Sequence, residues 1–360
     1  MTAKVSCWHF SVYVLVGLLI LVSPQQSSGA GEPPAEGCRI LVSSDRHVAP
    51  AAELASTKGY PDIIALENSL IKITSVPNRG RLLFDFHYKP AERSLTYTEV
   101  SPMPVGLEGK FFLEYGGLYP SYPWNPRANQ PYNLDYETQD RSPAKCVLEV
   151  FKKEDEDLPL NFLTRLRIKE GDPAVYFTVE LSNPITKSHS IDWKQHLVLA
   201  SGTEMSSETR LVLPRGADQT IVLESESEWL GKSGDRLSLP GKWQKWGNFQ
   251  ERANLRVPLE DVPGDRVMLE DPTAGLNFVQ EWEAETGYDH LEILSWGPGY
   301  RNVFGAFPGF RISAVAPDLT VQPGEAQTFE LKLYPEETTV REEVSEEKEE
   351  ESVQCPCSSG

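Results

Sequence analysis

Short runs in which apolar and polar side chains alternate dominate the chain from about Asp62 to Pro335. Clear examples are residues 70–76 (LIKITSV), 174–181 (AVYFTVEL) and 328–333 (TFELKL). A period of two places one face of a segment on a core and the other in solvent, which is typical of β-strands. Turn-forming Gly, Pro, Asn and Asp separate the runs, and no segment shows a helical period over three to four turns. The pattern predicts a single all-β domain over residues 62–335, folded as a large antiparallel β-sandwich.

The N-terminal segment has a different pattern. An unbroken apolar run at residues 12–22 (VYVLVGLLILV) is followed by Pro24 and by the small residues 28–30 (SGA). This order is typical of a signal peptide, and the run is short for a membrane span. We expect residues 1–30 to be a signal peptide and the mature chain to be secreted or periplasmic, without a transmembrane helix. An uncleaved anchor and a lipid-modified Cys38 are the alternatives.

Residues 31–61 are poor in aromatics, and we expect them to be a linker with one strand at 38–42. Residues 336–360 begin with a strongly acidic run, and like charges in series favour a disordered, solvated tail. The tail also holds Cys355 and Cys357, but no neighbouring Cys or His cluster indicates a metal site.

Composition narrows the possible partners. The chain has 34 Lys and Arg against 53 Asp and Glu, a net charge of −19. Nucleic-acid binding depends on basic side chains that contact phosphates, so this balance argues against a nucleic-acid partner. Neutral and cationic ligands remain possible. The sequence also lacks a dinucleotide fingerprint, a P-loop, a nucleophile elbow and a zinc-protease helix motif.

Aromatic and turn residues alternate closely at residues 115–126 (YGGLYPSYPWNP). Two adjacent glycines and three prolines disfavour a central strand, so we expect a loop. Aromatic faces with polar edges suit the apolar C–H face and the hydroxyls of a sugar ring. The alternative is a loop folded onto the core with its aromatics buried. A second aromatic group at residues 229–249 either lines the same cleft or pins a long loop.

A candidate acid and base lie in two further strand-like segments. Alternation in residues 288–296 places His290, Glu292, Leu294 and Trp296 on one face. Apolar neighbours raise the pKa of a carboxyl, which would make Glu292 a usable base, although an ordinary exposed glutamate fits the same spacing. His196 precedes an apolar run and is either a site residue or a hydrogen-bonded structural histidine.

In order and spacing, several segments together resemble the galactose mutarotase-like superfamily, which comprises aldose 1-epimerases and uncharacterised relatives. These segments are residues 66–82, 114–117 (EYGG), 195–202 (QHLVLASG), 291–293 (LEI) and 321–325 (VQPGE). The resemblance implies a β-supersandwich with a sugar cleft on its concave sheet, and a chemistry that needs no cofactor and no metal. It implies Glu292 as the base that takes the anomeric hydroxyl proton and His196 as the acid that protonates the ring oxygen. The candidate substrate contacts are Arg81, Tyr115, Trp124, Trp193 and His290.

The leading functional hypothesis is therefore an exported carbohydrate-binding protein with a sugar or glycan ligand, acting as an aldose 1-epimerase if it is catalytic. Tyr115 stands where mutarotases carry the histidine of a His-Gly-Gly loop. That departure favours the alternative of a non-catalytic sugar-binding or structural module in a polysaccharide-processing system. A polysaccharide lyase or hydrolase relative is a third hypothesis, since such enzymes also use β-sandwich domains.

Overall fold

The fold is almost entirely β-strand in the part of the chain that the computed structural model describes. The described residues are 37–43, 62–77, 80–98, 100–104, 111–121, 134–154, 159–199, 205–213, 220–224, 228, 230–238, 245–248, 252–259, 266–282, 287–300 and 309–338. The expected signal peptide, the acidic tail beyond residue 338 and Trp124 lie outside them. Helical structure within these ranges is limited to short 3-10 turns: η3 (Lys89–Ala91), η5 (Trp246–Asn248) and η6 (Pro298–Tyr300). The predicted all-β class is confirmed.

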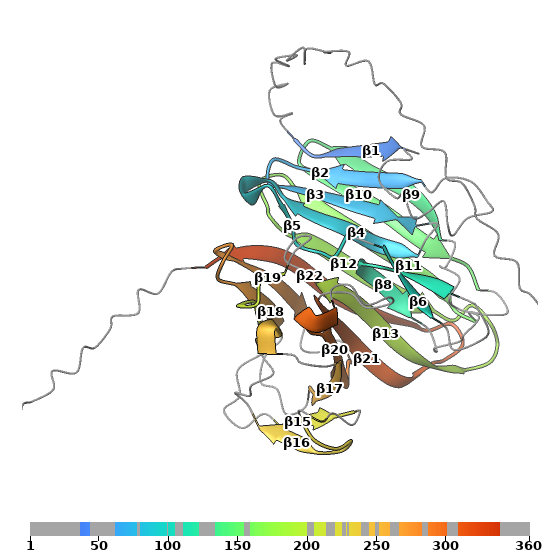
Figure 1. Ribbon diagram of the computed structural model, residues 1–360. Helices are drawn as coiled ribbons and strands as arrows, with labels where there is room; N and C mark the ends of the chain where they lie inside the picture. Colours follow the sequence, from blue (N-terminus) through green and yellow to red (C-terminus); the bar gives the residue numbers. More distant parts are fainter. Residues whose placement is uncertain are drawn as a thin grey trace, which may run out of the picture. The chain divides into compact units, whose positions relative to one another are not determined.

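The larger sheet has twelve antiparallel strands, which Figure 1 shows in their spatial order. From one edge to the other these are β1 (Arg39–Ser43), β2 (Ile63–Glu67), β3 (Ile71–Val76), β4 (Arg81–Tyr88), β8 (Gly117–Ser121), β13 (His189–Leu199), β21 (Gly309–Val321), β20 (His290–Trp296), β17 (Ala253–Pro258), β15 (Thr220–Leu223) and β16 (Arg236–Ser238), with β5 (Arg93–Ser94) beside β4. The sheet thus includes β1, which corresponds to the strand that we expected at residues 38–42.

The smaller sheet has eight strands. Their order is β14 (Arg210–Val212), β18 (Arg266–Asp271), β19 (Leu276–Trp282), β22 (Ala326–Glu337), β12 (Val175–Ser182), β11 (Asn161–Lys169), β10 (Lys145–Lys152) and β9 (Asp135–Ser142). A separate hairpin joins β6 (Val100–Pro104) to β7 (Phe111–Tyr115). The alternating runs 70–76, 174–181 and 328–333 fall on β3, β12 and β22. The predicted antiparallel β-sandwich is confirmed.

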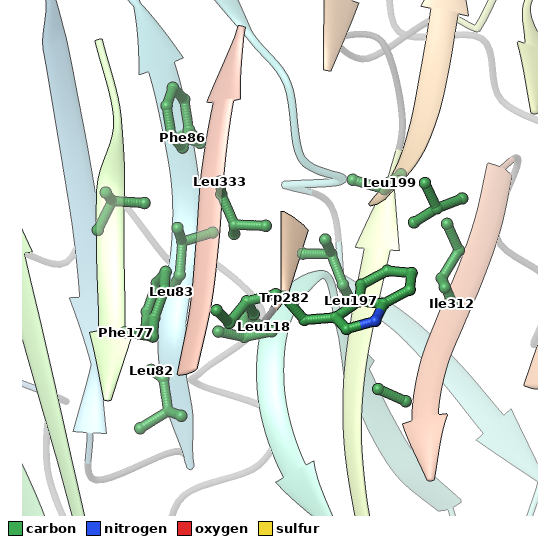
Figure 2. Close-up of a cluster of buried hydrophobic side chains, with 14 of the residues drawn as sticks. Leu82, Leu83, Phe86, Leu118, Phe177, Leu197, Leu199, Trp282, Ile312 and Leu333 are labelled. Atoms are coloured by element: carbon green, nitrogen blue, oxygen red, sulfur yellow. The ribbon is translucent and has the colours of Figure 1, made fainter. Parts of the chain in front are cut away.

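The inward faces of the two sheets enclose one large hydrophobic core (Figure 2). Aromatic pairs join the sheets: the rings of Phe86 and Phe278 lie 5.1 Å apart, and Trp193 lies 5.9 Å from Phe162 and 6.0 Å from Phe329. Burying each such side chain contributes about 1.5–3 kcal/mol. This core explains why the strands alternate so regularly.

The aromatic segment from Tyr115 to Ser121 is not the loop that we expected. Residues 117–121 form β8, a central strand between β4 and β13. The two glycines permit close packing: a Cβ on Gly116 would lie 1.5 Å from the Tyr97 carbonyl oxygen, and one on Gly117 would lie 1.9 Å from that of Leu83. Gly117 also has φ +82°, a conformation that other residues rarely adopt. The glycines therefore mark a close approach of strands instead of a surface turn.

Candidate functional site

A row of polar side chains crosses the larger sheet on the face that points away from the core. Tyr119 of β8 pairs with His196 of β13, His196 with Ser313 of β21, Ser313 with Glu292 of β20, and Glu292 with Arg256 of β17. Directly paired residues share a face of the sheet. We call these five residues the polar row.

The opposite face of the same strands fixes the direction in which the polar row points. Leu197, Ile312 and Leu291 adjoin row residues in sequence and are fully buried in the core between the sheets. Since neighbouring residues of a strand point to opposite faces, the row points away from that core. A small second cluster of Val198, Leu294 and aromatic rings packs beside the row.

His196 and Glu292 lie on strands separated only by β21. Neighbouring strands are about 4.8 Å apart, which places the two backbones roughly 10 Å from each other. Ser313 lies between them and is paired with both. The register therefore brings together the two residues that the family resemblance implied as acid and base.

The His196 imidazole is buried, and its neighbours hold it in one orientation. Its Nδ1 lies 2.6 Å from Ser313 Oγ, and its ring centroid is 4.9 Å from that of Tyr119. Burial, helped by the nearby positive charge of Arg311, lowers the pKa of His196 well below 6.5. At neutral pH the ring is therefore uncharged, and it would have to gain a proton before it could act as a general acid.

Glu292 carries an ion pair that the sequence analysis did not anticipate. Lys194 Nζ donates to Glu292 Oε1 at 2.7 Å, and His290 Nε2 is 3.8 Å from the same oxygen. Burial alone would raise the pKa of Glu292, but His290 and the Lys194 ammonium outweigh it and hold that pKa at about 2. The expectation of a raised pKa was wrong, because it considered apolar neighbours and omitted the lysine.

Lys194 was missed although the sequence holds a signal for it. It lies two residues before His196 on β13, so alternation alone places both side chains on one face. Its pairing partner on β21 is Val315, whose own partner on β20 is His290. The lysine therefore reaches diagonally across β21 to Glu292. This reach depends on the strand order, which the sequence does not reveal.

His290 connects Glu292 to a second carboxylate at the edge of the site. Its Nδ1 lies 2.7 Å from Asp289 Oδ2, and Arg256 Nη2 donates to the same Asp289 oxygen at 3.1 Å. His290 and Arg256 lower the pKa of Asp289. Charges of both signs thus alternate along this part of the face, and Glu292 is held between two cationic or hydrogen-bonding neighbours.

The remaining candidate contacts fall in different places. The Arg81 guanidinium lies 3.8 Å above the ring of Tyr119, so this buried arginine adjoins the polar row. Trp193 faces the opposite way: it is 2% exposed and packs in the core against Phe162 and Phe329. Trp193 is therefore a core residue and does not face a ligand on the polar row. Tyr115 ends β7, and Trp124 lies outside the described residues.

Other kinds of site find little support in the described part of the chain. No group of three or more His, Cys, Asp or Glu side chains there could hold a metal ion. No helix among those residues is long and apolar enough to cross a membrane. A small hollow lined by Arg93, Asp271 and apolar side chains including Phe278 shares no residue with the polar row. Trp246, from the second aromatic group, is buried and donates from Nε1 to the Trp296 carbonyl at 2.7 Å, so it pins its segment to β20.

Neither a protein-family model nor a curated protein sequence matches the chain. Several solved structures do. A TPR-domain containing protein from Parabacteroides distasonis superposes with a TM-score of 0.62 at 12% identity, over 84% of this chain and 56% of that one. A galactose mutarotase-like protein from Clostridium acetobutylicum superposes with a TM-score of 0.54 at 13% identity, over 84% of this chain and 99% of that one. The Slr1438 protein from Synechocystis sp. PCC 6803 gives a TM-score of 0.54 at 13% identity, over 79% and 98% of the two chains.

At these identities the similarity establishes the fold. The chain has the galactose mutarotase-like β-sandwich fold, as the resemblance in its sequence implied. The described domain spans just over half of the Parabacteroides distasonis protein and nearly the whole of the Clostridium acetobutylicum one. Function has to be argued from the site, because one fold serves many functions.

Proposed function

We propose that this protein binds a sugar on the polar row of the twelve-stranded sheet. The single observation that carries the proposal is the row itself, in which side chains with ring faces, donors and acceptors follow one another on five adjacent strands. A pyranose needs an apolar surface for its C–H face and partners for its hydroxyls. Tyr119 and Trp296 offer rings, while the partly exposed Glu292 and Lys194 offer hydrogen-bonding groups.

Aldose 1-epimerase activity is the second candidate. The observation that favours it is the strand register, in which Ser313 is paired with both His196 and Glu292 and so brings the candidate acid and base together. In that reaction Glu292 would take the proton of the anomeric hydroxyl while His196 gives one to the ring oxygen. The ring would open, rotate and close on the other face, with each proton later returned. The pKa values favour sugar binding over catalysis as the first candidate. Glu292 is ionised but ion-paired, and His196 is neutral.

Catalysis would therefore require the sugar to change the site that it enters. A hydroxyl that took over the contact of Lys194 with Glu292 would let the carboxylate become more basic, because His290 and the Lys194 ammonium together keep its pKa low. This requirement separates the two candidates: binding can use the ion pair as it stands, whereas epimerisation must loosen it.

The test is calorimetric titration of the purified protein with D-glucose, D-galactose and D-mannose, followed by polarimetry on freshly dissolved α-anomers. We expect saturable binding that weakens about 10- to 100-fold in Glu292→Gln, since a charge-assisted hydrogen bond is lost. Glu330→Gln, on an exposed position of β22 in the other sheet, is the matched control and should bind normally. Absence of binding to these sugars and to a glycan array would overturn the proposal.

Polarimetry decides between the candidates once binding is seen. An optical rotation that decays faster than in buffer, and no faster than buffer in Glu292→Gln, would establish the epimerase. A decay equal to buffer with intact binding would establish the binding module.

Export is a separate part of the proposal, supported by the apolar run at 12–22 and the small residues before position 31. Mass spectrometry of the protein recovered from its native cells should find a chain that begins near residue 31 outside the cytoplasm. A chain that still begins at Met1 in the cytoplasmic fraction would refute export.

A further inference from the structure

Two cysteines more than a hundred residues apart in the chain meet in the core. Cys38, immediately before β1, is 9% exposed, and Cys146 of β10 is fully buried. The Cys38 Sγ lies 3.9 Å from the carbonyl oxygen of Ile168, and Ile168 is the residue paired directly with Cys146 across β10 and β11. Cys146 also hydrogen-bonds to the Cys38 sulfur through its thiol and its backbone amide. Both residues are thiols in this structure.

The backbone holds the two segments together independently of the sulfur atoms. The Cys38 amide donates to the Pro143 carbonyl at 2.9 Å, just before β10. A Cβ on Gly37 would lie 3.0 Å from the Pro143 Cβ, so the chain passes close to that turn. The main-chain contacts therefore hold the two cysteines beside each other in the folded domain.

We propose that Cys38 and Cys146 form a disulfide bond that ties the start of β1 to β10 of the other sheet. The bond would form by exchange with a disulfide oxidant, such as oxidised glutathione or a disulfide oxidoreductase. One thiolate attacks the oxidant and releases one thiol; the second cysteine attacks the mixed disulfide and releases the other. Two thiols lose two electrons and two protons, and the oxidant gains them as two thiols.

The bond would matter because β1 is a short edge strand, held mainly by its pairing with β2 and by the contacts around Cys38. This strand lies at the edge of the larger sheet and most of its side chains are exposed, including Leu41 at 47% and Val42 at 48%. Apart from its pairing with β2, it is held by Ile40, which packs against the core, and by an ion pair between Arg39 and Glu67 at 3.0 Å, with Arg39 44% exposed. Such an edge strand frays easily, and a covalent link at the residue just before it would keep it in the sheet.

The chemistry also predicts when the bond would form. Burial and the nearby carboxylate of Glu170 raise the pKa of the Cys38 thiol, so little thiolate is present once the domain has folded. Exchange in the folded state should be slow, and the bond should form during folding. This makes refolding in a glutathione redox buffer the appropriate preparation.

The experiment begins with peptide mapping of the full chain, refolded with reduced and oxidised glutathione and then alkylated in denaturant. Digestion with trypsin and a glutamate-specific protease separates Cys38 (in residues 37–39) from Cys7, and yields Cys146 in residues 146–149. We expect these two peptides to be linked, with a mass lower than their sum by two hydrogen atoms. Alkylation of both cysteines, or linkage of Cys38 to Cys7, Cys355 or Cys357, would overturn the proposal.

Thermal unfolding supplies a second measurement that does not depend on digestion. Adding a reductant should lower the unfolding midpoint of the oxidised protein by about 5–10 °C. The same addition should leave Cys38→Ala and Cys146→Ala unchanged, while the double replacement of Cys355 and Cys357 by Ala should keep the full shift. A midpoint of the wild-type chain that does not respond to reductant would contradict the proposal even if a fraction of linked peptide were seen.

Discussion

The ion pair between Lys194 and Glu292 makes a quantitative prediction about acid stability. The pKa of Glu292 is held at about 2, against an ordinary value of 4.5. Because the folded-state pKa is the lower one, the interactions of Glu292 with His290 and Lys194 stabilise the folded protein fully above about pH 4.5. That contribution is lost progressively as the pH falls toward 2.

The structure also sets the magnitude. A gap of about 2.5 pH units corresponds to at most about 3.5 kcal/mol, at about 1.4 kcal/mol per unit. Both side chains retain some contact with solvent, at 27% and 29% exposure, which weakens the interaction. We therefore expect Glu292 with its partners His290 and Lys194 to contribute about 1–3 kcal/mol of acid-sensitive stability. Lys194→Met removes the ammonium but keeps most of the side-chain volume. It should raise the pKa of Glu292 by about 1–2 units, because burial then acts with less opposition.

The assay is a ¹³C NMR titration of glutamate-labelled protein, with the Glu292 signal assigned by its loss in Glu292→Gln. Urea unfolding at pH 6 and pH 3 provides the corresponding free energies. Lys187→Met, which removes an exposed lysine outside the site, is the control and should leave the Glu292 titration unchanged. A Glu292 signal that titrates near 4.5 in the wild-type protein, or at the same pH with and without Lys194, would refute the reasoning.

Three further changes test the geometry of the fold and the site. Ser313→Ala removes the partner of the buried His196 Nδ1 and should destabilise the protein by about 1–3 kcal/mol in urea unfolding; an unchanged midpoint would argue against that hydrogen bond. Gly117→Ala should destabilise by more than about 4 kcal/mol, because its Cβ would meet a carbonyl of β4, whereas Gly171→Ala, at a similar φ but in open space, should cost about 1–2 kcal/mol. Equal losses at the two glycines would contradict the close strand approach. Trp193→Phe should lower stability by about 1–3 kcal/mol and leave sugar affinity unchanged, since this side chain faces the core; a selective loss of affinity would return it to the site.

Much of the fold could be predicted from local pattern. Residues 70–76, 174–181 and 328–333 alternate because one face of each strand meets the core, and they fall on β3, β12 and β22. The segment at Gly116 and Gly117 was misread, because glycine serves both turns and close strand packing. Which of the two applies depends on the neighbouring strand β4, and that neighbour is set by long-range pairing.

The site could be predicted only in part. Alternation correctly indicates that His290 and Glu292 share a face, and His290 Nε2 lies 3.8 Å from Glu292 Oε1. Ser313 carries no motif, and nothing in the sequence places β21 between β13 and β20. The prediction of a raised pKa for Glu292 was wrong for the same reason. Lys194 reaches Glu292 only across the intervening strand β21, and the sequence does not reveal that strand order.

The central claim, that a sugar binds on the polar row, is tested most directly by following the His196 ring signals in NMR spectra as D-galactose, D-glucose or D-mannose is added. We expect saturable shifts of the His196 and Glu292 signals at the concentrations that saturate calorimetric binding, with the core ring of Trp193 unaffected. Binding that leaves both signals unmoved and shifts only residues of the eight-stranded sheet would contradict it.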